Sequence, residues 1–281
     1  MRFFQDITTN PFLLTGLLAS LGASFACGVI GPYVITRRIV FLTGAIAHMA
    51  IGGIGAAVYL RSQFPDALDW LSPLHGATVA TLVAALLIGL VHERVAERMD
   101  TLIGAMWAVG MSVGILLIKF TPGYETELMS YLFGNIATVS KGNVWLILVL
   151  DVAIAVVVLI YHKQLLAICL DQEQAQLQGV NVLATNVVLL SLVGLTVICL
   201  IQVVGLILVL ALLTLPAAMA AHHVSRIAPM MLVSAVLCMV LTTVPRIGAY
   251  GTRVSPESAV VLAAAGLYLV SVAVQRVRTR R

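Results

Sequence analysis

The sequence has few charged residues: Asp, Glu, Lys and Arg make up only 10% of its 281 residues, against about 25% in a typical soluble domain. Hydrophobic residues make up 61% of the chain, which is more than a soluble core of this size would bury. The run Val203–Ala221 has 19 consecutive residues without a charged side chain, about the length that a helix needs to cross a bilayer. The scarcity of charge therefore excludes an ordinary soluble protein and predicts a membrane protein.

Long polar stretches are also missing, so we expect residues 1–281 to form a single transmembrane domain without an appended nucleotide-binding or catalytic domain. The sequence contains no GxxxxGK[ST], HExxH or GxSxG pattern, which argues against an enzyme. The four cysteines lack the spacing of a disulfide framework or a zinc site. Basic residues occur in short clusters between apolar runs rather than along one face, which argues against nucleic-acid binding.

The apolar runs predict an all-α polytopic membrane protein with about nine transmembrane helices, or eight if one run is re-entrant. The runs are long and continuously apolar, whereas barrel strands would show segments of about ten residues with alternating polarity. The nine windows lie at roughly 12–31, 39–60, 74–91, 101–120, 143–161, 183–201, 203–221, 228–244 and 257–275.

The distribution of basic residues predicts the orientation. One alternating set of loops holds ten of the sixteen Lys and Arg residues and the other set holds six. Because cytoplasmic loops carry the excess of basic residues, we place the richer set inside, the N-terminus outside and the C-terminal tail in the cytoplasm. The richer set comprises Arg37, Arg38, Arg94, Arg98, Lys163, Arg226, Arg276, Arg278, Arg280 and Arg281.

Two titratable side chains are predicted near the middle of the membrane. His48 lies ten residues after Arg38, or about 15 Å into a core of roughly 30 Å. Asp151 lies in the middle of its apolar run, where a carboxylate costs at least about 2.5 kcal/mol and should face the bundle interior, a partner or water. Imidazole and carboxylate groups both bind zinc, manganese and ferrous iron. His48 and Asp151 are therefore our candidate metal ligands, although each could instead form a hydrogen bond with a neighbouring helix.

Small residues and one proline mark places where helices pack closely or bend. Gly52 and Gly53 crowd the second apolar run, and Gly110 and Gly114 form a small-xxx-small pattern in the fourth. Such residues let helix backbones approach closely. Pro216 removes a backbone donor from the seventh run, so we expect a kink there that could act as a hinge.

The cytoplasmic connection His162–Val182 predicts a short capped helix. Asp171 is suited to the N-cap, Glu173 to the first turn, and Gly179 to the left-handed position that ends a helix. A short helix in a cytoplasmic loop can serve as a docking element.

Several segments together resemble the integral membrane subunits of ATP-binding cassette (ABC) importers for manganese, zinc and iron. The segments occur in the family's order between about residues 10 and 275. They are Arg37 and Arg38 followed by His48 within Gly44–Met49, the outer loop Leu132–Asn135, the cytoplasmic set Asp171, Glu173, Ala175, Gly179 and Val180, and the runs Val204–Val209 and Leu213–Ala218.

The resemblance implies a permease fold related to that of vitamin B12 and siderophore importers, in the cytoplasmic membrane of a prokaryote and surrounded by lipid. It implies that His48 belongs to the metal path and that residues 163–180 form a coupling helix, with Asp171, Glu173, Ala175 and Gly179 in contact with a separate cytoplasmic ATPase. It further implies an extracytoplasmic metal-binding protein and a second permease, either a copy or a paralogue. No permanently bound cofactor is expected, because the divalent metal ion is the transported substrate.

The sequence departs from the family at the candidate metal site. Gly44 and Ala47 occupy positions where the family usually has an acid and often has a serine, and Asn135 replaces a common aspartate. An acid four residues before a histidine would share its helix face. Gly44 has no side chain that could act in this way, so Asp151 is our candidate for the missing carboxylate.

Two other transport classes remain as alternatives. One is the related permease class for iron chelates or cobalamin. The other is an ion-coupled secondary carrier that uses His48 and Asp151 as a proton relay.

Overall fold

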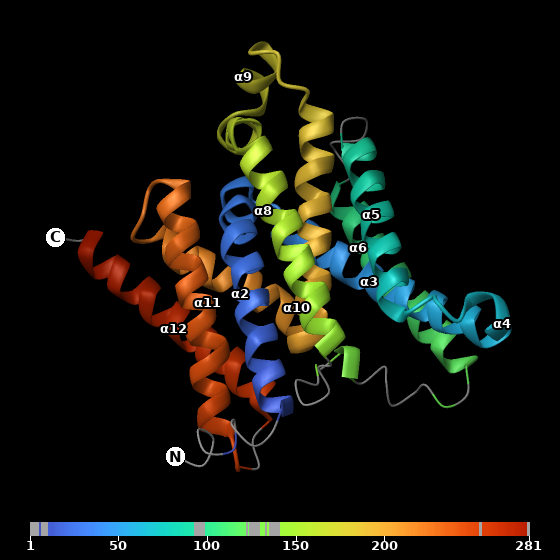
Figure 1. Cartoon of the computed structure of the whole chain (residues 1–281). Helices are drawn as coiled ribbons and strands as arrows, with labels where there is room; N and C mark the ends of the chain where they lie inside the picture. Colours follow the sequence, from blue (N-terminus) through green and yellow to red (C-terminus); the bar gives the residue numbers. More distant parts are fainter. Residues whose placement is uncertain are drawn as a thin grey trace. The chain divides into compact units, whose positions relative to one another are not determined.

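The computed structural model describes residue 6 and residues 11–92, 99–121, 123, 130–132, 134, 141–252 and 255–279. All regular elements within these residues are α-helices (Figure 1). They are α2 (Pro11–Arg37), α3 (Val40–Gln63), α4 (Pro65–Leu68), α5 (Pro73–His92), α6 (Met99–Lys119), α8 (Lys141–Leu170), α9 (Gln172–Leu177), α10 (Val182–Ala221), α11 (Ile227–Ala249) and α12 (Pro256–Thr279).

The described residues contain nine helical segments that are long and apolar enough to cross a membrane, which confirms the nine predicted spans. The largest difference from the predicted boundaries is in α8, which continues to Leu170 instead of ending near Tyr161. The segment from His162 to Leu170 contains no proline or glycine, and Leu165 and Ile168 are buried. At 1.5 Å per residue a helix of this length reaches beyond the hydrocarbon core into the headgroup region.

The chain forms two compact units that share α8 and α10. The first unit comprises Met1–Arg38, Phe133–Val156 and Cys199–Arg281, and the second comprises Ile39–Leu132 and Val157–Ile198. Because each unit is assembled from separate stretches of the chain, a prediction made span by span does not reveal this grouping.

In the first unit α2 packs against α11, and α11 packs against α12 (Figure 1). A Cβ on Gly28 of α2 would overlap Ala235 of α11, so the two backbones are in direct contact. One turn away, the hydroxyl groups of Ser24 and Thr242 lie 3.2 Å apart at hydrogen-bonding distance. Helices in a membrane associate through close packing and polar contacts of this kind.

Arg246 provides a second polar link between α11 and α2. Its side chain is buried, with 7% exposure, and its Nη1 donates hydrogen bonds to the carbonyl oxygen of Gly16 at 3.0 Å and to Ser20 Oγ at 2.9 Å. Just beyond α11, the Tyr250 hydroxyl donates a hydrogen bond to Asp6 Oδ2 at 2.9 Å. This hydrogen bond raises the pKa of Tyr250 above its ordinary value.

In the second unit α3 packs against both α5 and α6 (Figure 1). The contact with α5 is made by Gly53 and Gly76, because a Cβ on either residue would overlap the carbonyl oxygen of the other. α5 in turn meets the first part of α10, where Gly194 faces Thr81. Most of α3 is buried by these neighbours, so this helix forms the core of the second unit.

The 40-residue α10 is interrupted at Gly205, whose φ of 73° and ψ of 165° are not helical. Gly134, which has a φ of 82°, lies against this interruption, and a Cβ on Gly134 would be 2.5 Å from the carbonyl carbon of Val204. The two segments that hold Gly134 and Gly205 are therefore in contact. Glycine suits both positions because of their positive φ angles, and at Gly134 it also leaves room for the close approach.

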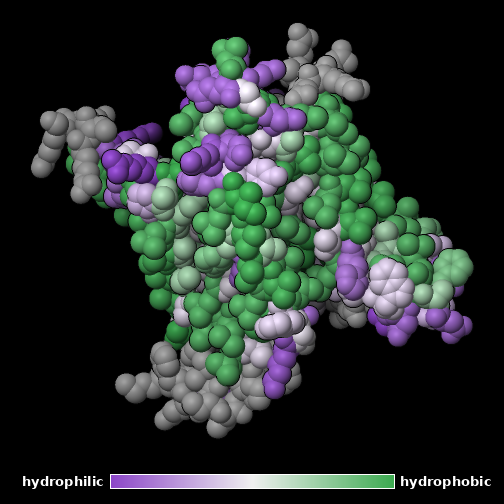
Figure 2. Space-filling view, turned by 45° about the horizontal axis from the view of Figure 1, so that its top comes forward, coloured by the Kyte–Doolittle hydropathy of each residue, from purple (hydrophilic) through white to green (hydrophobic). Residues whose placement is uncertain are grey.

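Hydrophobic side chains make up most of the surface visible in Figure 2, and hydrophilic side chains form small clusters on it. Large apolar residues are exposed on several of the long helices, for example Val79 on α5 and Leu159 on α8. A contiguous apolar surface of this kind is unfavourable in water and is suited to contact with lipid. The structure and composition together describe a multi-pass membrane protein.

Candidate functional site

The candidate ligand His48 lies on α3 and is partly buried. Its Nδ1 lies 2.9 Å from the carbonyl oxygen of Gly44, one turn earlier on the same helix. Because a carbonyl oxygen only accepts hydrogen bonds, Nδ1 carries the proton, and Nε2 of the neutral imidazole keeps its lone pair. Histidines that bind metal commonly donate their other ring N–H in this way. The local geometry therefore leaves His48 Nε2 as the nitrogen able to bind a cation.

A tryptophan that the sequence analysis did not single out lies beside His48. The ring centroids of His48 and Trp107 are 4.3 Å apart, and the ring planes are inclined by 36°. Trp107 comes from α6, which crosses α3 closely because a Cβ on Gly52 would be 3.0 Å from the carbonyl oxygen of Gly110. Sequence reasoning could have singled out Trp107 from its position in the middle of an apolar run, because tryptophan in membrane proteins favours the interfaces.

The second candidate, Asp151, lies on α8 in the part of that helix that belongs to the first unit. Its side chain is only 6% exposed, and Oδ1 has no hydrogen-bond partner among the described residues. Gly22 of α2 provides the space for it, since a Cβ there would be 2.9 Å from Asp151 Oδ2. Asp151 therefore faces the interior of its unit, which is one of the predicted environments, and its Oδ1 has unused hydrogen-bonding capacity.

Asp151 and His48 belong to different units, so their pairing stays a prediction. Within the described part of the chain no group of three or more His, Cys, Asp and Glu side chains is arranged to hold a metal ion. The described residues therefore contain individual side chains of types that can bind a metal ion, rather than a closed metal-binding cage.

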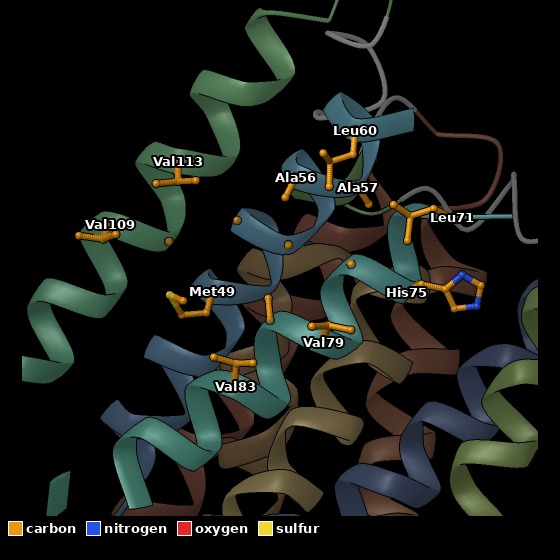
Figure 3. Close-up of a pocket in the computed structure, with 15 residues that line it drawn as sticks. Met49, Ala56, Ala57, Leu60, Leu71, His75, Val79, Val83, Val109 and Val113 are labelled. Carbon is orange, nitrogen blue, oxygen red and sulfur yellow. The ribbon is translucent and has the colours of Figure 1, made fainter. Parts of the chain in front are cut away.

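A groove of about 410 Å³ lies between α3, α5 and α6 in the second unit. In Figure 3 its lining includes Met49 of α3, Val79 and Val83 of α5, and Val109 and Val113 of α6. The lining also includes His75, whose imidazole lies at the edge of the groove in Figure 3. The other lining side chains are apolar and offer no nitrogen or oxygen ligands, so the groove suits lipid or another hydrophobic segment better than a hydrated cation.

The predicted capped helix in the cytoplasmic loop is present as α9. Asp171 is the N-cap, and its Oδ1 accepts hydrogen bonds from the backbone N–H groups of Glu173 at 2.9 Å and Gln174 at 3.0 Å. Gly179 has a φ of 83°, and the N–H of Val180 donates to the carbonyl oxygen of Ala175 at 3.1 Å. The cap and the left-handed glycine therefore match the prediction, while residues 163–170 belong to the end of α8.

Two large apolar side chains in and next to α9 are mostly exposed. Leu170 is 74% exposed and Leu177 is 88% exposed, while Ala175 is buried on the inner side of α9. Leu170 at the end of α8 and Leu177 at the end of α9 therefore leave apolar surface open for contact. Asp171 and Glu173 lie beside these leucines and are exposed.

The predicted packing residues are also placed by the structure. Gly52 faces Gly110 of α6 and Gly53 faces Gly76 of α5, both in backbone contact. Pro216 lies within α10, and the carbonyl oxygen of Leu212, four residues earlier, lies 4.0 Å from the Cys238 thiol. The non-helical backbone angles in α10 are at Gly205, and the kink expected at Pro216 stays a prediction.

Relatives with assigned transport roles match nearly the whole chain. A probable metal transport system membrane protein of Chlamydia trachomatis is 34% identical over 266 residues, which is 95% of this chain and 90% of the relative. The manganese transport system membrane protein MntC of Halalkalibacterium halodurans is 28% identical over 242 residues, 86% of this chain and 80% of the relative.

A solved structure shows the same fold over the same length. The structure of PsaBC from Streptococcus pneumoniae in complex with Fab has a TM-score of 0.85 and 27% sequence identity, and the match covers 96% of this chain and 94% of that chain. Residues 9–275 also match the ABC 3 transport family. The chain is therefore a membrane permease that belongs to the ABC 3 transport family.

Proposed function

We propose that this protein is the membrane-spanning subunit of an ABC importer for a divalent transition-metal ion, and that His48 is a ligand in the metal path. The observation that carries this proposal is the anchored imidazole, whose Nδ1 is held by the Gly44 carbonyl oxygen and whose Nε2 is left as a lone-pair donor. The names of the relatives from Chlamydia trachomatis and Halalkalibacterium halodurans support metal as the substrate.

Manganese is the first ion to test, because the Halalkalibacterium halodurans relative is named as a manganese transporter. Zinc and ferrous iron stay candidates because an imidazole ligand suits both ions. Gly44 lies where an acid would add an oxygen ligand on the face of His48. In this chain the imidazole must therefore act with a ligand from another element, and Asp151 is our proposed donor.

The transport cycle requires that the permease respond to an ATPase, and α9 is the proposed contact. The full sequence has no phosphate-binding loop of its own, so ATP hydrolysis is assigned to a separate cytoplasmic subunit. The exposed Leu170 and Leu177 supply the apolar contacts, and the Asp171 cap and Gly179 hold α9 in shape between them. Closure of the ATPase would move α9, and the continuous helix α8 would transmit this movement to the membrane segment.

The proposed complex contains two further partners. A second permease, either another copy of this chain or a paralogue, would complete the path, as ABC importers need two membrane-spanning halves. An extracytoplasmic metal-binding protein would deliver the ion at the outer ends of the helices. The inner positions of α9 and of the C-terminus follow from the basic-residue distribution in the loops.

The test is ATP-driven uptake of ⁵⁴Mn²⁺ into proteoliposomes that contain the permease, its ATPase and its binding protein. We expect His48→Ala to reduce uptake at least about tenfold, since loss of one metal ligand or its support has effects of this size. His75→Ala is the matched control, because His75 is an exposed histidine at the start of α5 in the same unit. Size-exclusion chromatography verifies that both variants assemble with the ATPase.

The same assay separates the alternatives. Uptake by His48→Ala at the wild-type rate would remove the histidine from the path, and uptake that persists without the ATPase or ATP would favour an ion-coupled secondary carrier. Asp151→Asn preserves the shape of the buried side chain and should reduce uptake if the carboxylate binds the ion or a proton. Zn²⁺ and Fe²⁺ as competitors then rank the three ions.

A further inference from the structure

Trp107 differs in position from the other two tryptophans of the chain. Trp70 and Trp145 lie outside or near the ends of long helices and are 67% and 69% exposed, as expected for side chains at a membrane interface. Trp107 is instead the ninth residue of α6, which begins at Met99, and so lies about 12 Å along the helix. An indole at this depth has an N–H group that is not easily satisfied. We therefore expect a specific contact with a neighbouring helix to hold Trp107 at this depth.

The backbone contact between α3 and α6 explains why Trp107 meets His48. Gly110 contacts the backbone at His48 and Met49, since its Cβ would be 2.9 Å from the His48 carbonyl oxygen. Trp107 precedes Gly110 by three residues and therefore lies on the same face of α6. With glycine at the contact, no side chain separates the two helices, and the two rings fill the adjoining space with centroids 4.3 Å apart.

The imidazole of His48 is thus restrained from two sides. The carbonyl oxygen of Gly44 holds its Nδ1 edge, and the Trp107 ring lies against the imidazole plane. The indole has no atom that binds a metal ion, because its Nε1–H is a donor only. Trp107 can consequently act on the ion only through the orientation of His48.

We propose that Trp107 is a positioning residue that holds the His48 imidazole with Nε2 directed toward the transported ion. This inference rests on the proposed function, in which His48 binds that ion. A ring held in one orientation binds more tightly than a freely rotating one, because less conformational entropy is lost on binding. Removal of the indole should weaken metal binding in the manner of other residues that orient metal ligands, by about 10-fold or more.

A purely structural role makes a different prediction, and two substitutions separate the two roles. Trp107→Phe keeps an aromatic ring against the imidazole, whereas Trp107→Leu keeps an apolar side chain but removes the ring. In the ⁵⁴Mn²⁺ assay we expect Trp107→Leu to raise KM about tenfold with kcat within about twofold of wild type, and Trp107→Phe to restore KM to within about threefold. A structural role alone would lower the melting temperature and the yield of both variants and leave KM unchanged.

A spectroscopic measurement reads the contact directly. In a Trp70→Phe/Trp145→Phe background Trp107 is the only tryptophan of the chain. Titration of the assembled complex with Co²⁺ should quench its emission, and His48→Gln in the same background should abolish this quenching. A change in emission that persists in His48→Gln would overturn the proposal.

The outcomes also distinguish this inference from the proposed function. If His48→Gln lowers uptake and folded Trp107→Leu keeps the wild-type KM, the positioning role is overturned and the metal path stands. If His48→Gln leaves uptake and Co²⁺ quenching unchanged, the histidine itself is removed from the path, and the positioning role falls with it.

Discussion

Glycine serves two different physical needs in the second unit. At the crossing of α3 with α5, Gly53 is required for space, because a Cβ would overlap the carbonyl oxygen of Gly76. At the end of α9, Gly179 is required for its backbone angle: its φ is 83°, yet no atom lies within 4 Å of the position that a Cβ would occupy. The first glycine tolerates no side chain, and the second tolerates any that accepts a left-handed conformation.

This difference corresponds to the two proposed functions of these regions. The backbone of α3 is in direct contact with those of α5 and α6, so the candidate metal ligand His48 lies in a closely packed part of the unit. The α9 turn is open and is held by a cap and one glycine, so its exposed leucines can meet a partner without disturbing the membrane segment. Substitutions in the first region should change the stability of the fold, and those in the second should change docking.

The largest effect is expected for Gly53→Ala. The added methyl group must displace the α5 backbone, and overpacking of this kind costs about 3 kcal/mol, which lowers the melting temperature of a protein of this size by at least about 6 °C. The matched control is Gly104→Ala on α6, where nothing lies within 4 Å of the new Cβ. Thermal unfolding of the detergent-solubilised permease measures both.

Gly52→Ala tests the other crossing of α3, with α6. Its Cβ would lie 3.0 Å from the Gly110 carbonyl oxygen, a distance that a small shift relieves, so we expect about 1 kcal/mol. A melting temperature of Gly53→Ala equal to that of Gly104→Ala would contradict close packing as the role of the glycines where α3 crosses α5.

An intermediate effect, on docking rather than stability, is expected for Gly179→Ala. A left-handed conformation costs a residue with a Cβ about 1 kcal/mol or more, which corresponds to roughly fivefold weaker association with the ATPase. Gly179→Asn is the matched variant, because asparagine adopts this conformation more readily. Affinity of the purified permease for the ATPase is the measurement, and equal losses for Ala and Asn would argue against the backbone explanation.

The most local effect is expected for Asp171→Ala, which removes the N-cap of α9. Loss of a capping side chain costs about 1 kcal/mol, and the loss is confined to a helix of six residues. Amide hydrogen exchange at Glu173 and Gln174 should therefore become about fivefold faster, while Asp171→Ser should keep most of the protection. Equal exchange in the two variants would show that the carboxylate does not hold the turn.

Local features of the fold could be predicted because they depend on neighbouring residues. Length and apolarity predict each span without knowledge of its partners, and the described residues contain the nine expected segments. The cap at Asp171 and the left-handed Gly179 are likewise set within ten residues. The end of α8 was misplaced because helix formation continues beyond the apolar window where the sequence has no breaker.

Contacts between distant segments could not be predicted in the same way. The pairing of His48 with Trp107 depends on α6 crossing α3 at Gly110, and the burial of Arg246 depends on α2 offering Gly16 and Ser20 as acceptors. The contact of Gly134 with α10 at Gly205 likewise joins segments that are distant in the sequence. In each case the apolar pattern reveals that a helix packs closely but not which helix it meets.

By itself, the sequence determined about nine apolar spans and a short capped helix in the connection that follows the fifth span, because scarce charge and capping residues act locally. Only the tertiary structure decided which nitrogen of His48 keeps its lone pair and which side chain faces its ring, because these depend on the position of a carbonyl oxygen and on glycine contacts between helices.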